Sequence, residues 1–225
     1  MRRVRLLVAL AAVSAAVAGT ARAALPLAPL SSVGTLKPAP AAGPLGPEGV
    51  AIPKAPVFEN VTNRKLNQTV DGVTCQSVEK IAFHIHAHLT IFVNGKAEAI
   101  PYGIGIGQPI SGVNTAAGPF VTKGSCFMWL HTHASDGIIH IEAPKLQTFT
   151  LGQFFAVWGV KLGSTGVGSA KGKVTTFYNG KVWTGKPGAV PLDSEAQIQL
   201  DVGKPLIAPE HIVFPKALAP SKIGK

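Results

Sequence analysis

The stretch IAFHIHAHLTIFVNG, residues 81–95, alternates between two kinds of side chain. Successive side chains of a β-strand point to opposite faces, so this period of two predicts a strand over residues 81–93 with one apolar face and one histidine face. The histidine face carries His84, His86 and His88. Asn94-Gly95 then predicts a two-residue turn, because both residues tolerate positive φ, and this turn folds residues 96–100 back on the strand.

The same turn chemistry recurs along the chain. Two further hairpins are predicted at Asp136-Gly137 and Asn179-Gly180. One short helix is predicted near residues 151–160, because Thr150 and Gln153 have capping-box spacing ahead of an aromatic stripe. We therefore expect an all-β fold, built mainly from antiparallel hairpins as a small barrel or sandwich, with that single helix.

Three zones of composition divide the chain. Residues 1–23 combine a basic start, a short apolar run and the small-residue pattern Ala21-Arg22-Ala23, which predicts a secretory signal peptide. Residues 24–56 are rich in Pro and Ala and poor in aromatic residues, which predicts a disordered tether. Residues 57–225 are expected to form a single β-rich metal-binding domain. No transmembrane segment is expected in the mature chain.

The charge and the cysteine content indicate which classes of partner and which cell compartment to expect. The formal net charge is +10, but four of the five arginines lie in the predicted signal peptide and the lysines are scattered. Proteins that bind nucleic acids favour arginine forks and basic stripes, so nucleic acid is not an expected partner. An exported chain, in the periplasm, cell envelope or extracellular space, is expected to join its two cysteines, Cys75 and Cys126, in a disulfide.

A second group of histidines lies in LHTHASDGIIHIE, residues 130–142. A two-residue turn at Asp136-Gly137 would pair His133 with His140 and His131 with Glu142, and would put all four on one face. A slip by one residue would mix polar and apolar faces, which a half-buried hairpin disfavours. Three imidazoles beside a carboxylate are typical of zinc, copper and iron sites. Glu142 is expected to be a fourth ligand, an orienting acceptor or, in an enzyme, a catalytic base.

The motifs HIHAHLTIFVNG and LHTHASDGIIHIE, together with LGQFF from residue 151, resemble a group of exported bacterial and archaeal histidine-rich β proteins of unassigned function. The resemblance implies a shared fold and transfers no activity. If the two histidine strands are neighbours, their polar faces form one pocket of up to six imidazoles that could hold one ion or two. These are His84, His86, His88, His131, His133 and His140.

Three hypotheses about function follow. The first is an exported protein that captures or hands on copper or zinc, because the chain has more histidines than one catalytic centre needs. The second is a metalloenzyme in which His131, His133 and His140 hold the metal and an open position activates water or oxygen. The third is a structural envelope module without metal. Imidazole suits copper and zinc alike, so the ligand type does not choose between them.

Overall fold

The computed structural model describes residues 24–61, 66 and 69–220. The signal peptide predicted for residues 1–23 therefore lies outside the described residues. Within the described part of the chain, no helix has both the length and the apolar character needed to cross a membrane.

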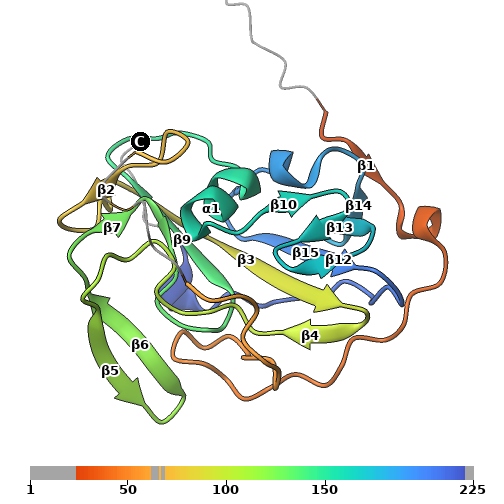
Figure 1. Cartoon of the computed structure of the whole chain (residues 1–225), viewed down its shortest axis with the longest axis horizontal. Coiled ribbons are helices and arrows are strands. Elements are labelled where there is room, and N and C mark those ends of the chain that lie inside the picture. The colour runs from red at the N-terminus through yellow and green to blue at the C-terminus, as the bar shows by residue number, and fades with distance from the viewer. Residues whose placement is uncertain (1–23, 62–65, 67–68, 221–225) are drawn as a thin grey trace, which may run out of the picture.

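Eight strands form the central sheet (Figure 1). They are β1 (Leu27–Ala28), β3 (Phe83–Val93), β4 (Lys96–Glu98), β8 (Leu130–His131), β9 (Ile138–Ala143), β13 (Val174–Tyr178), β14 (Lys181–Trp183) and β15 (Ala196–Val202). Their order is β1-β14-β13-β15-β3-β9-β8, with β4 paired to β3 outside that path. Neighbouring strands run antiparallel except β15 and β3, which are parallel.

Smaller elements surround this sheet. They are β2 (Cys75–Gln76), β5 (Ser111–Thr115), β6 (Gly118–Lys123), β7 (Phe127–Met128), β10 (Leu162–Gly163), β11 (Gly166–Val167), β12 (Ala170–Lys171), the helix α1 (Leu151–Trp158) and the 3-10 turns η1 (Leu30–Val33), η2 (Pro187–Ala189) and η3 (Lys216–Leu218). The β-rich class with one α-helix is confirmed. The sheets pack in a sandwich-like way, and the described strands do not close a barrel.

Strand β3 separates two environments. Its odd-numbered residues, including Leu89 and Ile91, join the main apolar core. The aromatic side chains of α1, such as Phe154 and Trp158, belong to the same core, so α1 covers this face. The predicted capping box starts α1 at the expected place, because the Thr150 hydroxyl accepts from the Gln153 amide and the Gln153 side chain accepts from the Thr150 amide.

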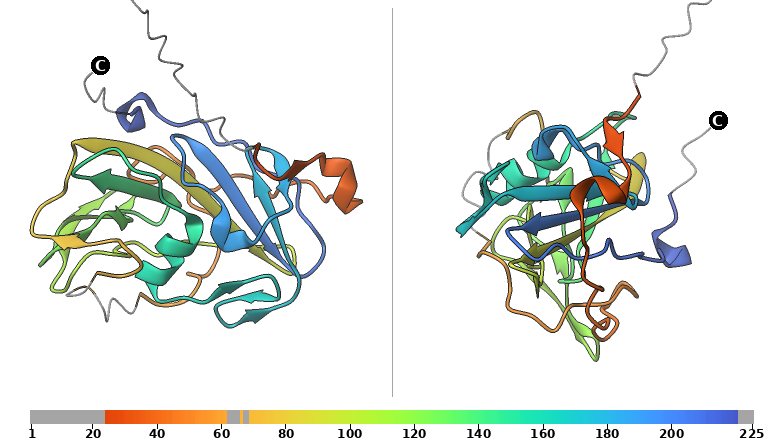
Figure 2. Two further views of the ribbon diagram at one scale, coloured as in Figure 1. Left: turned by 90° about the horizontal axis from the view of Figure 1, so that it is seen from above. Right: turned by 90° about the vertical axis from the view of Figure 1, so that its right-hand side faces the viewer.

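The histidine face of β3 is covered as well, by the two ends of the described chain. Val50 from the N-terminal segment and Leu218 from η3 pack with Ile138 of β9 in a small apolar cluster. Figure 2 (right) shows η3 and α1 on opposite sides of the large sheet. The histidines are therefore enclosed and do not form a solvated polar face.

The prediction of a disordered tether over residues 24–56 is wrong. β1 pairs with β14, Lys37 bridges to Ile207, and Val50 is buried. A segment rich in Pro and Ala cannot build a core of its own, but its backbone can still pair with a neighbouring strand and its few apolar residues can enter an existing core. Through those contacts, residues 24–56 pack against the domain.

Two of the three predicted hairpins have the expected register. Val93 faces Lys96 across the Asn94-Gly95 turn, and Tyr178 faces Lys181 across the turn at residues 179–180. The disulfide between Cys75 and Cys126 is also confirmed, and it ties the β2–β7 pair together. The geometry that brings the histidines together therefore depends on the third hairpin.

In the third hairpin the predicted pairing is wrong by two residues. His131 lies opposite His140, and Leu130 lies opposite Ile141. Residues 132–137 form a wider loop in place of a two-residue turn, and the Gly137 carbonyl accepts from the Leu89 amide of β3 at 2.9 Å. Side chains repeat every two residues along a strand, so a shift by two keeps the predicted faces and changes only the neighbours.

Candidate metal centre

Three neighbouring strands bring one histidine each into a single row. β9 lies between β3 and β8, and the register sets His140 beside His86 on one side and beside His131 on the other. The ring centroids of His86 and His140 are 4.5 Å apart, and those of His131 and His140 are 5.3 Å apart. His84 and His133 flank the row, so five of the six predicted ligands meet in one cluster.

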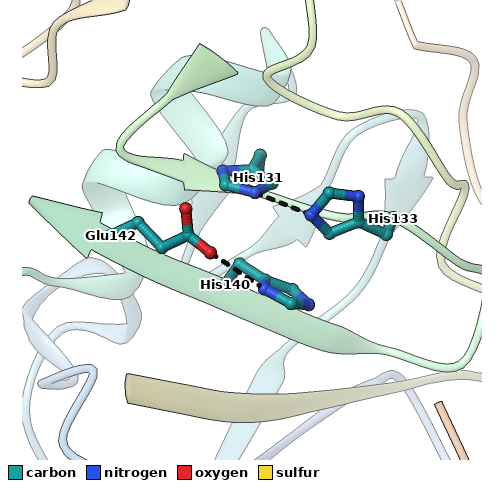
Figure 3. A group of neighbouring side chains, drawn as sticks. All are labelled: His131, His133, His140 and Glu142. Atoms are coloured by element: carbon teal, nitrogen blue, oxygen red, sulfur yellow. Dashed lines mark hydrogen bonds and ion pairs between the residues drawn. The ribbon is translucent and has the colours of Figure 1, made fainter. Parts of the chain in front are cut away.

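His131 and His133 form the first pair of this cluster (Figure 3). Their Nε2 atoms are 3.0 Å apart. The Nδ1 atom of His131 lies 2.8 Å from the Met128 carbonyl, and that of His133 lies 2.5 Å from the Val121 carbonyl. A carbonyl oxygen can only accept, so each Nδ1 carries the hydrogen and each Nε2 presents a lone pair.

Both rings of this pair are held in the neutral form. Burial lowers the pKa of His131 well below its usual range and lowers that of His133 to about 4. Two lone pairs then face each other in a buried site, an arrangement that a bound cation stabilises. A ring fixed through one nitrogen with the other left free is also the usual arrangement of a metal-binding histidine.

His84 and His86 of β3 form a second pair, in which one ring, His86, is fixed by a backbone carbonyl. Their Nε2 atoms are 3.1 Å apart, and the Nδ1 atom of His86 lies 2.8 Å from the Leu218 carbonyl. Burial, followed by the neighbouring His140, lowers the pKa of His86 to about 3. The C-terminal turn η3 therefore orients a ligand that lies more than a hundred residues earlier in the sequence.

His140 lies between the pairs and contacts two carboxylates. Its Nδ1 atom is 3.3 Å from Glu142 Oε1, and its Nε2 atom is 2.6 Å from Glu48 Oε1. Burial alone would lower the pKa of His140, but the hydrogen bonds to Glu142 and Glu48 outweigh it and raise the pKa to about 9. In this state His140 carries a proton at neutral pH, which a metal has to displace.

Glu142 lies opposite His84 and not opposite His131 as expected. Its Oε1 atom is 3.1 Å from His84 Nε2, while its Oε2 atom is buried and has no hydrogen-bond partner in the described part of the chain. A buried carboxylate oxygen without a partner is costly, and a metal ion is one way to satisfy it.

Two further carboxylates at the cluster were not predicted. Glu48 comes from the segment that was expected to be a tether, and its carboxyl group also faces the buried carboxyl group of Asp136, whose pKa is raised to about 8 by burial and by Glu48. Glu79, just ahead of β3, places Oε1 3.4 Å from His133 Nε2, and burial raises its pKa. Nearness to the histidine strand could have suggested Glu79, whereas nothing in the sequence around Glu48 marks it.

His88 is the one predicted ligand that the structure keeps apart from the cluster. Its Nε2 atom donates to the Asp136 carbonyl at 2.8 Å, and its Nδ1 atom lies 3.4 Å from the Thr90 hydroxyl. Both ring nitrogens are therefore engaged inside the protein. Burial lowers the pKa of His88 to about 4, so the ring is a neutral structural link between β3 and the 132–137 loop.

Two groups of side chains bring their ligand atoms within 4.8 Å of one another, close enough to surround an ion. The first contains His131, His133, His140 and Glu142, and the second contains His84, His86 and His140. Buried clusters of this composition could hold a metal, and nitrogen donors with one or two carboxylates suit transition metals.

No protein-family model, curated protein or solved structure matches this chain. The resemblance to exported histidine-rich β proteins stays a prediction. Function is therefore inferred from the chemistry of the five-histidine cluster, His84, His86, His131, His133 and His140, and its carboxylates.

Proposed function

We propose that this protein is an exported metal-binding protein that captures copper or zinc and holds it at His131, His133 and His140. The observation that carries the proposal is the 3.0 Å approach of the His131 and His133 Nε2 atoms, both with their Nδ1 hydrogens donated to backbone carbonyls. Lone pairs aimed at one point in a buried site form a preorganised cation site. Export is supported by the disulfide, which persists in oxidising compartments.

Access to the cluster supports capture and release. The side chains of His84 and Glu79 are 26% and 35% exposed, whereas those of His133, His140 and Glu142 are below 10%. An ion can therefore meet exposed ligands first and buried ligands afterwards.

One cavity in the described part of the chain lies apart from the cluster. It has a volume of about 480 Å³ and is lined by residues from the 39–54 segment, β3 and the 209–212 segment, with none of the five clustered histidines. This hollow of substrate size is thus not centred on the cluster, which favours metal handling over catalysis.

The test is elemental analysis of the mature protein, purified without a histidine tag or chelator. We expect at least one equivalent of copper or zinc per chain. The double variant His131→Gln/His133→Gln should bind one equivalent of metal less than the unmodified protein and keep the circular dichroism spectrum of the folded protein. The matched control is His211→Gln, which changes an exposed histidine and should keep full loading. Failure of the unmodified protein to take up either metal would overturn the proposal and favour the structural module.

A metalloenzyme is the second candidate, because the Oε2 atom of Glu142, which has no hydrogen-bond partner among the described residues, lies beside three imidazoles and could accept a proton from a bound water. The zinc-loaded protein would then hydrolyse an activated ester such as 4-nitrophenyl acetate, and Glu142→Gln would lower the rate at least 100-fold without loss of zinc. An activity no greater than that of the metal-free protein would reject this candidate.

A further inference from the structure

The five-histidine cluster contains two separate pairs of ligands. The pair His131/His133 and the pair His84/His86 each bring two Nε2 atoms to within 3.1 Å. They come from opposite sides of β9, and β3 and β8 are about 9.6 Å apart at the usual strand spacing. A metal needs its nitrogen ligands at about 2.0 Å. Among the described residues, the ligand atoms that lie within 4.8 Å of one another form two groups, and neither group contains both pairs, so each pair suits an ion of its own.

His140 is the ligand that both groups contain. Its ring stacks on His131 and on His84, and it meets His86 and His133 edge to face. Its two nitrogens already face two different groups, because Nδ1 faces Glu142 and Nε2 faces Glu48. An imidazole ring that loses both N–H hydrogens can therefore give one nitrogen to each of two ions.

The carboxylates supply the charge that two ions require. Glu48 and Glu142 contact His140, and Glu79 contacts His133, so three carboxylates surround the cluster. Two divalent ions carry four positive charges, which three carboxylates and one bridging imidazolate would balance. Buried charge is tolerated only when it is compensated in this way. The buried Oε2 atom of Glu142, which has no hydrogen-bond partner among the described residues, is a further oxygen that could bind an ion.

We infer that the protein holds two metal ions side by side, one at His131/His133 and one at His84/His86, with His140 as a shared bridging ligand. This inference rests on the proposed metal-binding function and extends it from one ion to a coupled pair. With metal–nitrogen distances of about 2.0 Å the two ions would be about 6 Å apart. Metal entry then begins at the more exposed His84 side.

Copper(II) titration with elemental analysis and electron paramagnetic resonance tests the inference. The unmodified chain should bind two coppers, and their signal should integrate to well under two spins, because a bridging imidazolate couples neighbouring copper(II) ions magnetically. His84→Gln/His86→Gln should bind one copper with a full one-spin signal, and so should His131→Gln/His133→Gln. The control His211→Gln should keep two coupled coppers.

Each other outcome has a distinct meaning. One copper in the unmodified chain, lost only in His131→Gln/His133→Gln, would overturn the second ion and leave the proposed function standing. Two coppers with a full two-spin signal would overturn the role of His140 as a bridge. No bound copper or zinc would overturn the proposed function and this inference together. The two pair variants are independent, so one that fails to fold leaves the other as the test.

Discussion

At the scale of single residues, the nitrogen that carries the hydrogen decides what each histidine does. His86, His131 and His133 donate from Nδ1 to backbone carbonyls, and the Nε2 atom of each lies close to that of a neighbouring histidine. His88 donates from Nε2 instead, and its ring links two segments of backbone. Side chains on the same face of neighbouring strands thus have opposite roles, because backbone carbonyls lie at different edges of their rings.

The structural role assigned to His88 leads to a stability prediction. His88→Ala should lower the free energy of unfolding by about 2–4 kcal/mol, because it opens a cavity and leaves the Asp136 carbonyl without its donor. Metal stoichiometry should stay unchanged. Guanidinium unfolding and elemental analysis measure the two quantities. Loss of metal from a folded His88→Ala protein would show that His88 is a ligand.

Proton competition at His140 predicts how metal affinity depends on pH. The metal-free protein holds a proton on His140 up to a pKa of about 9, and binding has to release it. Below that pKa, each fall of one pH unit should therefore weaken zinc affinity about tenfold or more. Competition titrations against a chelator at pH 6.5, 7.5 and 8.5 measure this slope. Equal affinities across this range would contradict the proton-linked role of His140, and His140→Gln should flatten the slope.

At the scale of elements, β9 organises the site. It pairs with β3 on one side and with β8 on the other, and it supplies His140 and Glu142. The short β2–β7 pair, tied by Cys75–Cys126, leads directly into β8 and His131. Restraint at this point helps hold the His131 backbone close to β9.

The disulfide is therefore expected to contribute to stability and to the site. Replacing both cysteines by serine should cost about 2–5 kcal/mol, because the unfolded chain regains the freedom of a loop that spans 51 residues. Chemical unfolding of the oxidised protein and of Cys75→Ser/Cys126→Ser measures the difference. If the two proteins had the same unfolding midpoint and the same denaturant dependence, the disulfide would not contribute to stability.

At the scale of the whole molecule, the two ends of the described chain complete the centre. Residues 44–52 bring Glu48 to His140, and η3 brings the Leu218 carbonyl to His86. The apolar cluster of Val50, Ile138 and Leu218 holds both ends against the histidine face. The metal centre is thus closed by segments that the sheet itself does not contain.

This closure predicts a rigid N-terminal segment. Backbone order parameters from NMR relaxation should be about 0.85 for residues 44–52, similar to those of β3, whereas a free tether would give values below about 0.6. Val50→Ala should lower the values in this segment more than those in β3, because it removes part of the cluster that anchors it. Low order parameters in the unmodified protein would support the original prediction of a disordered tether.

The sequence alone determined the local features of this protein. The period of two over residues 81–93, the Asn-Gly turns and the capping box at Thr150 act through neighbouring residues, so they predicted β3, two hairpins and α1 correctly. The alternation also predicted one face with His84, His86 and His88 on the first strand, and one face with His131, His133 and His140 on the third hairpin. Two cysteines in a chain with a predicted signal peptide were enough to propose the disulfide.

Only the tertiary structure decided which of these faces meet. Strand order set β9 between β3 and β8, and a loop anchored by a backbone contact to β3 shifted the β8–β9 register by two. His88 lies outside the site because its ring bonds to Asp136, 48 positions later in the sequence. Glu48 reaches the site through His140, which lies 92 positions later. Such contacts arise from packing and backbone pairing over long distances, which residue patterns along the chain do not record.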